Sequence, residues 1–139
     1  MADRWPVVLE AFGLVDALED LAERTEAGSA VQVALEIDQS AGRPRPEVER
    51  AAWRVAQLAL DNAVRHAAAS QITIVIAVGP ERVRLSIADD GRGFDPVDPV
   101  RAGARGLADL ARQATAVGGT VAIDAGSAKG TVVRFEWPG

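Results

Sequence analysis

The sequence has 139 residues and lacks several of the residue types on which common functional sites are built. It contains no cysteine, which excludes disulfides, thiolate nucleophiles and cysteine-based zinc sites. Its single histidine excludes a metal site made of several imidazoles. The 20 acidic residues outnumber the 15 basic ones, so the net charge of −5 provides no basic surface for nucleic acid. Apolar runs are short and interrupted by charge, so we predict no transmembrane helix, signal peptide or membrane contact, and expect a cytoplasmic protein.

The remaining composition is typical of a folded globular domain. Hydrophobic residues make up 48% of the chain and charged residues 25%. A chain of this length is sufficient for one domain with a substantial hydrophobic core. We therefore expect a single folded domain, without an internal repeat or an interdomain linker.

Hydrophobic periodicity predicts alternating helices and strands along the chain. Helices are predicted at 8–27, 46–68 and 105–117, with Gly13 as a candidate break in the first. Strands are predicted at 30–37, 71–78, 82–88, 120–123 and 131–137, the last four as two hairpins. This order predicts an α+β sandwich in which helices cover one face of a mixed, mostly antiparallel sheet.

Asn62 is the most informative residue, because it places an amide in an Ala/Leu/Val-rich helical segment. Leu58, Arg65 and His66 share its face at helical spacing. An amide oxygen suits Mg²⁺, which takes few protein ligands when phosphates and waters complete its octahedron, and Arg65 can then meet a phosphate. The alternative is a solvated polar stripe on an amphipathic helix, and this segment alone favours that alternative.

A second motif, Asp89-Asp90-Gly91-Arg92-Gly93-Phe94, follows a predicted strand. A carboxylate at a strand end can accept a hydrogen bond from an exocyclic amine such as that of adenine. The two glycines allow the backbone to approach a ligand closely. Asp and Gly are also ordinary turn formers, and the motif alone favours a simple turn.

Two further glycine motifs are weaker indications of a ligand site. Gly103-Ala104-Arg105-Gly106-Leu107 joins a long loop to a helix, whose free N–H groups can bind an anion or simply form a glycine N-cap. The length of the loop before it suggests a lid. Lys129-Gly130-Thr131 alone indicates only a turn.

The order and spacing of these motifs resemble a known family. The motifs that carry the resemblance are Asn62–His66, Asp89–Phe94, Arg105–Leu107, Gly118-Gly119 and Gly130-Thr131. They resemble the ATP-binding catalytic domain of bacterial sensor histidine kinases, in the short-lid branch of the gyrase/chaperone/histidine kinase/mismatch-repair ATPase superfamily. The resemblance extends to the opening segment, Phe12–Leu18, and implies a Bergerat-type sandwich. Residues 1–28 would be a helical lead-in and 29–139 the ATP-binding catalytic domain, in one domain overall.

The resemblance also implies ligands for the phosphate end of the site. Asn62 would bind Mg²⁺ bridging the ATP phosphates, with Arg65 and His66 near them. Arg105, Gly106, Leu107 and the start of their helix would hold phosphates. Magnesium is required because phosphoryl transfer develops charge that the metal neutralises.

At the base end, the resemblance implies that Asp89 accepts the adenine amine with support from Thr131. Gly91 and Gly93 would let the backbone pass the nucleotide, and residues 94–104 would close over it as a lid.

Position 58 departs from the family pattern. Family members usually have Glu or Asn one turn before the magnesium-binding Asn, where this chain has Leu58. Leucine can neither polarise a nucleophile nor order the waters of magnesium, so no catalytic residue is assigned. His66 is interpreted as a residue lining the site and not as the phosphoacceptor.

The leading hypothesis is the ATP-binding domain of a two-component sensor histidine kinase. Its partners would be a dimerisation domain carrying the phosphoacceptor His, which this sequence does not contain, and indirectly a response regulator. One alternative is a degenerate nucleotide-binding regulatory module without catalysis, suggested by Leu58. Another is a serine kinase of the anti-sigma-factor type. The sequence leaves open whether the chain is an excised domain or a stand-alone module.

Overall fold

A computed structural model describes residues 6–65, 68–91, 104–124 and 130–139, with the side chains of the last helix described from Asp109 onward. The helices are α1 (Val7–Phe12), α2 (Leu14–Ala27), α3 (Pro46–Arg65) and α4 (Ala104–Ala116). The strands are β1 (Gln32–Gln39), β2 (Gln71–Gly79), β3 (Arg82–Asp89), β4 (Thr120–Asp124) and β5 (Thr131–Trp137). Within the described ranges, no helix is both long and apolar enough to cross a membrane.

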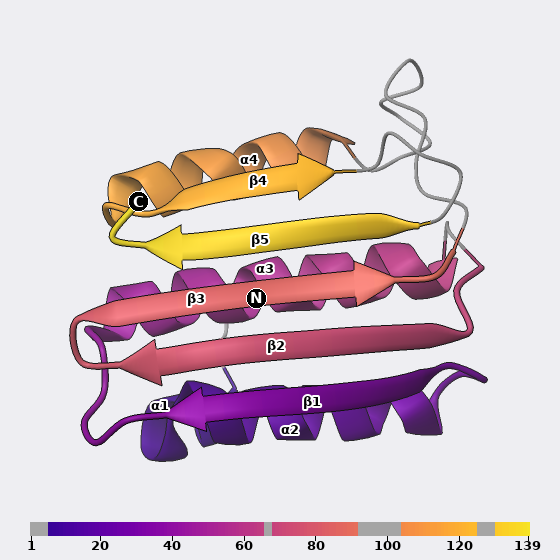
Figure 1. The fold of residues 1–139 in the computed structure, drawn as a ribbon, viewed down its shortest axis with the longest axis horizontal. Helices are drawn as coiled ribbons and strands as arrows, with labels where there is room; N and C mark the ends of the chain where they lie inside the picture. The colour runs from indigo at the N-terminus through magenta and orange to yellow at the C-terminus, as the bar shows by residue number, and fades with distance from the viewer. Residues whose placement is uncertain (1–5, 66–67, 92–103, 125–129) are drawn as a thin grey trace.

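The strands form one five-stranded sheet in the order β1-β2-β3-β5-β4. β1 runs parallel to β2, and the other neighbours are antiparallel, including the two predicted hairpins. The helices lie together on one face of this sheet, with α2 against β1, α3 across β3 and β5, and α4 against β4 (Figure 1). The predicted α+β sandwich with helices on one face is therefore confirmed.

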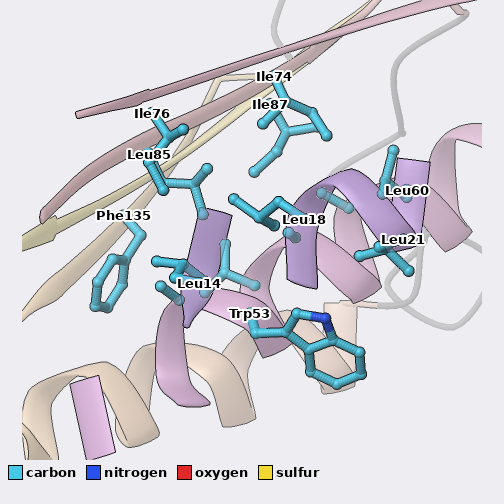
Figure 2. Close-up of a cluster of buried hydrophobic side chains, with 14 of the residues drawn as sticks. Leu14, Leu18, Leu21, Trp53, Leu60, Ile74, Ile76, Leu85, Ile87 and Phe135 are labelled. Carbon is cyan, nitrogen blue, oxygen red and sulfur yellow. The ribbon is translucent and has the colours of Figure 1, made fainter. Parts of the chain in front are cut away.

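The core lies between the sheet and the helices, because alternate residues of each strand point to that side. β2 and β3 bury their branched aliphatic residues there, and Phe135 of β5 is fully buried beside them (Figure 2). Leu14 and Leu18 of α2 and Leu60 of α3 close the layer from the helical side. Each such side chain contributes roughly 1.5–3 kcal/mol when fully buried, so this layer holds α3 firmly against the sheet.

Gly13 divides the first predicted helix into α1 and α2, as the sequence suggested. Its φ of +102° is a left-handed conformation that favours glycine, and its N–H closes α1 by donating to the Leu9 carbonyl at 3.0 Å. A Cβ at this position would lie 3.3 Å from the Arg43 Nε atom. The break therefore also makes room for a side chain from the loop before α3.

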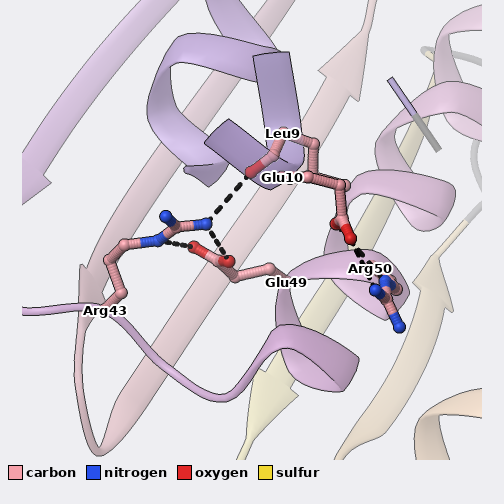
Figure 3. A network of polar contacts seen from close by, with 5 residues as sticks. All are labelled: Leu9, Glu10, Arg43, Glu49 and Arg50. Carbon is pink, nitrogen blue, oxygen red and sulfur yellow. Dashed lines mark hydrogen bonds and ion pairs between the residues drawn. The ribbon is translucent and has the colours of Figure 1, made fainter. Parts of the chain in front are cut away.

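A polar network fastens α1 to the start of α3 (Figure 3). Arg43 donates from Nη2 to Glu49 Oε1 at 2.7 Å and to the Leu9 carbonyl at 3.0 Å, and from Nε to Glu49 Oε2 at 3.1 Å. Glu49 is only 2% exposed, so its charge depends on this partner. Beside it, Arg50 Nη2 lies 2.5 Å from Glu10 Oε1, and this hydrogen bond lowers the pKa of Glu10.

Several element boundaries differ from the sequence prediction by one or two residues. β1 begins at Gln32 and not at residue 30, because its first pairing partner is Gln71 and Ser29 accepts the Val31 N–H at 3.3 Å in the preceding turn. α3 is described only to Arg65, and the end of the predicted helix at 66–67 lies outside the described residues. Ala68 then has a φ of +53°, so the helical path has ended by that residue.

Candidate functional site

Asp89 lies at the carboxyl end of the central strand β3, between Ile72 of β2 and Thr131 of β5. It follows Leu85 and Ile87 at alternate positions, so it shares the face that carries the helices. Its Oδ1 accepts a hydrogen bond from the Gly91 N–H at 2.9 Å. Burial raises the pKa of Asp89, and the charge of Asp90 raises it further, while the backbone N–H groups of Gly91 and Thr131 oppose the rise.

The Asp89 carboxylate can still accept a ligand hydrogen bond. An ionised carboxylate offers about four lone-pair sites, and the two backbone donors do not use them all. Thr131 is buried opposite Asp89 and opens β5. The predicted grouping of Asp89, Gly91 and Thr131 at one edge of the sheet is therefore present in the structure.

Gly130 contributes to this grouping in a way that the sequence did not indicate. Its φ is +98°, and a Cβ on it would lie 1.9 Å from the Asp89 carbonyl oxygen. The start of β5 therefore packs directly against the backbone that carries the Asp89 carboxylate. From the sequence, this glycine was expected only to form a turn.

The Asp90 side chain contacts the residues at the start of β2. Its Oδ1 accepts hydrogen bonds from the N–H groups of Ser70 at 2.8 Å and Gln71 at 3.0 Å, and its Oδ2 from the Ser70 hydroxyl at 2.6 Å. These donors lower the pKa of Asp90 to about 2, although the residue is exposed. The sequence motifs indicated a role for Asp89 but none for Asp90.

Asn62 lies half-buried on α3, next to the fully buried Ala63. Arg65, which the sequence placed near phosphates, pairs through Nε with Asp61 Oδ1 at 2.8 Å, and its side chain is 71% exposed. An exposed arginine paired in this way can exchange partners at little cost, because such surface pairs contribute about 0–1 kcal/mol.

An open groove of about 610 Å³ lies between α2, α3 and α4. The residues that line it are Leu21, Arg24, Thr25, Gly28, Ser29, Arg54, Gln57, Leu58, Leu60, Asp61, Val64, Arg65, Asp109, Leu110 and Gln113. Leu58 and Arg65 thus share one surface, as predicted. Asn62 is not among these lining residues, so in the described part of the chain it lies beside the groove and not within it.

The other predicted site residues are less fully described. Arg105, Gly106 and Leu107 lie in the first turn of α4, which begins at Ala104, one residue before the predicted start, but their side chains are not described. His66, Gly93 and most of the predicted lid lie outside the described residues. Among the residues that are described, no group of three or more His, Cys, Asp or Glu could hold a metal ion. The amide of Asn62 is an oxygen donor of the kind that Mg²⁺ accepts.

The fold and the position of Asp89 at the end of the central strand are those expected from the sequence motifs for an ATP-binding domain. Residues 47–139 match the family described as "Histidine kinase-, DNA gyrase B-, and HSP90-like ATPase". The chain belongs to this family, which confirms the resemblance inferred from the sequence motifs.

Curated relatives include sensor kinases with matching segments. The sensor histidine kinase LiaS of Bacillus subtilis (strain 168) is 30% identical over 133 residues, which cover 96% of this chain and 36% of LiaS. The oxygen sensor histidine kinase NreB of Staphylococcus carnosus (strain TM300) is 29% identical over 133 residues, which cover 96% of this chain and 38% of NreB. The chain thus spans little more than a third of these relatives.

Solved structures share the fold. The histidine kinase AdeS of Acinetobacter baumannii superposes with a TM-score of 0.60 at 20% identity, over 86% of this chain and 61% of that one. The histidine kinase domain of the Erythrobacter litoralis EL346 blue-light activated kinase gives a TM-score of 0.62 at 18% identity, over 89% of this chain and 61% of that one. At these identities the likeness concerns the fold alone.

Proposed function

We propose that this chain binds Mg-ATP as the catalytic domain of a two-component sensor histidine kinase. The observation that carries the proposal is the Asp89 carboxylate, held by Gly91 at the end of β3 in a chain of this ATPase family. The γ-phosphoryl group would pass to a His on a separate dimerisation domain, and from there to a response regulator. The corresponding location is cytoplasmic.

In this proposal each described residue has a distinct task. Asp89 accepts a hydrogen bond from the 6-amino group of adenine, and Thr131 holds Asp89 from the neighbouring strand. Asn62 offers an amide oxygen to the metal, and Arg65 exchanges Asp61 for a phosphate. When bound, magnesium supplies the positive charge that neutralises the phosphates during transfer.

Leu58 favours a second candidate, a nucleotide-binding module that does not catalyse. Its side chain is partly buried against the core and lines the groove beside Arg65, so the surface has an apolar group at this point. The sensor kinases named above do not favour the serine-kinase alternative, because each carries the name of a histidine kinase.

Phosphotransfer to a supplied phosphoacceptor domain distinguishes the two candidates. The chain and Leu58→Glu are each incubated with labelled Mg-ATP and a dimerisation domain whose His is either intact or replaced by Gln. Transfer by the unmodified chain to the intact domain alone supports the kinase proposal. Transfer only by Leu58→Glu supports the module without catalysis, and failure of Mg-ATP to bind at millimolar concentration rejects both.

A further inference from the structure

Asp90 forms a compact set of contacts with one short segment, Ser70-Gln71. Its carboxylate accepts hydrogen bonds from the Ser70 N–H, the Ser70 hydroxyl and the Gln71 N–H, at 2.8, 2.6 and 3.0 Å. Its own N–H donates to the Gln71 carbonyl at 3.2 Å. The side chain and the backbone of Asp90 therefore both form hydrogen bonds with the same two residues, and these bonds restrain the backbone at Asp90.

The segment that Asp90 grips links α3 to β2. Ala69 donates to the Ala63 carbonyl at 3.2 Å and so ties this segment to the last turns of α3, the helix that carries Asn62. The end of β3, the beginning of β2 and the end of α3 meet at one edge of the sheet, at the right of Figure 1. Asp90 therefore connects the strand that carries Asp89 to the helix that carries Asn62.

The neighbours of Asp90 in sequence are the two groups that form the base end of the proposed site. Asp89 precedes it and Gly91 follows it, and the Gly91 N–H donates to Asp89 Oδ1 at 2.9 Å. Because the three residues are consecutive, a rotation of the backbone at Asp90 moves the Gly91 donor relative to the Asp89 carboxylate. Holding Asp90 in place thus fixes the direction in which Asp89 presents its remaining lone pairs.

We propose that Asp90 is a positioning residue for base recognition: its hydrogen bonds to Ser70 and Gln71 orient the Asp89 carboxylate toward the amino group of the nucleotide base. This proposal rests on the proposed function, since it requires a nucleotide to recognise. The contacts are exposed, so their effect on global stability should be small compared with their effect on the position of the Asp89 carboxylate.

The test compares the affinities of the chain for Mg-ATP and Mg-GTP, because adenine has a 6-amino donor where guanine has a 6-oxo acceptor. Asp90→Ala should lower the affinity for ATP about tenfold, the value of one charge-assisted hydrogen bond, while GTP affinity changes less than about twofold. Asp90→Asn keeps an oxygen for the two backbone N–H groups and should restore most of the preference. Asp38→Ala removes an exposed carboxylate at the far end of β1 and serves as the matched control.

The outcomes separate the two proposals. If the unmodified chain prefers ATP and Asp90→Ala keeps that preference, or loses both nucleotides equally, the positioning role is wrong. If the unmodified chain binds neither nucleotide, or binds both alike, the assignment of Asp89 fails and the positioning role fails with it. Should Asp90→Ala unfold at the assay temperature, comparison of Asp90→Asn with Asp90→Leu replaces it, because leucine is close in size to asparagine but has no acceptor for the three donors. Of these two variants only Asp90→Leu removes the side-chain link, so a fall in its ATP preference supports the proposal and an unchanged preference overturns it.

Discussion

Replacing Gly130 by alanine should disturb the candidate site more than any other single methyl group. The left-handed φ of +98° costs an alanine roughly 1–2 kcal/mol. The added Cβ would also lie 1.9 Å from the Asp89 carbonyl oxygen, whereas real Cβ atoms essentially never approach closer than 3.0 Å. The start of β5 and the end of β3 must therefore separate by about 1 Å, and overpacking of this kind costs about 1–3 kcal/mol.

The two contributions predict that Gly130→Ala lowers the free energy of unfolding by about 2–5 kcal/mol. Chemical denaturation followed by circular dichroism measures this change. Gly28→Ala is the matched control, because Gly28 has a φ of −96° and its Cβ would make an ordinary 3.4 Å contact with the Arg24 carbonyl. We expect that variant to differ by less than about 1 kcal/mol.

The same displacement moves the Asp89 backbone, so nucleotide affinity should fall with stability. Titration of ATP into folded Gly130→Ala, at a temperature well below its melting point, should show a loss of about tenfold or more, the value of the Asp89 hydrogen bond. A Gly130→Ala variant as stable as Gly28→Ala, with unchanged ATP affinity, would refute the contact between Gly130 and Asp89.

Three further predictions concern other parts of the chain. Glu49→Ala should lower the free energy of unfolding by about 1.5–3 kcal/mol, because it removes the charged acceptor of Arg43. The control Glu47→Ala, at an exposed position, should lower it by less than about 1 kcal/mol. Equal losses in denaturant titrations would contradict the stabilising role of the Arg43–Glu49 ion pair. The folded-state pKa of Asp90 is depressed from 3.8 to about 2, so its stabilisation is complete above 3.8 and is lost as pH falls toward about 2. We expect a small difference in melting temperature between the unmodified chain and Asp90→Asn, which should shrink over that interval; a constant difference would argue against the hydrogen bonds of Asp90 to Ser70 and Gln71. Asn62→Ala should abolish the increase in ATP affinity on adding Mg²⁺ while leaving metal-free binding intact, and a retained magnesium effect in calorimetry would remove Asn62 as the ligand.

The sequence predicted much of the architecture because local patterns determine it. Strand alternation and glycine punctuation located every strand to within a few residues, and Gly13 marked the break between α1 and α2. The parallel pairing of β1 with β2 was not specified, because it depends on a crossover through α3 and not on a turn signal.

The candidate site was predictable only in part. Asp89, Gly91 and Thr131 could be recognised by residue type and motif order, and the structure places them together. Two contacts of the site join segments that are about 20 or more residues apart in sequence. They are the contact of Gly130 with the Asp89 backbone and the hydrogen bonds of Asp90 with Ser70. No local periodicity encodes such contacts, because they follow from strand register and from the path of the chain after α3.

The central claim is that this chain binds ATP through Asp89, and isothermal titration calorimetry with Mg-ATP tests it most directly. The unmodified chain and the control Asp38→Asn should bind with the same affinity. Asp89→Asn should bind about tenfold or more weakly, because its amide replaces a charged acceptor facing the adenine amine. Equal affinity of Asp89→Asn and the unmodified chain, or no heat of binding at millimolar Mg-ATP, would contradict the account.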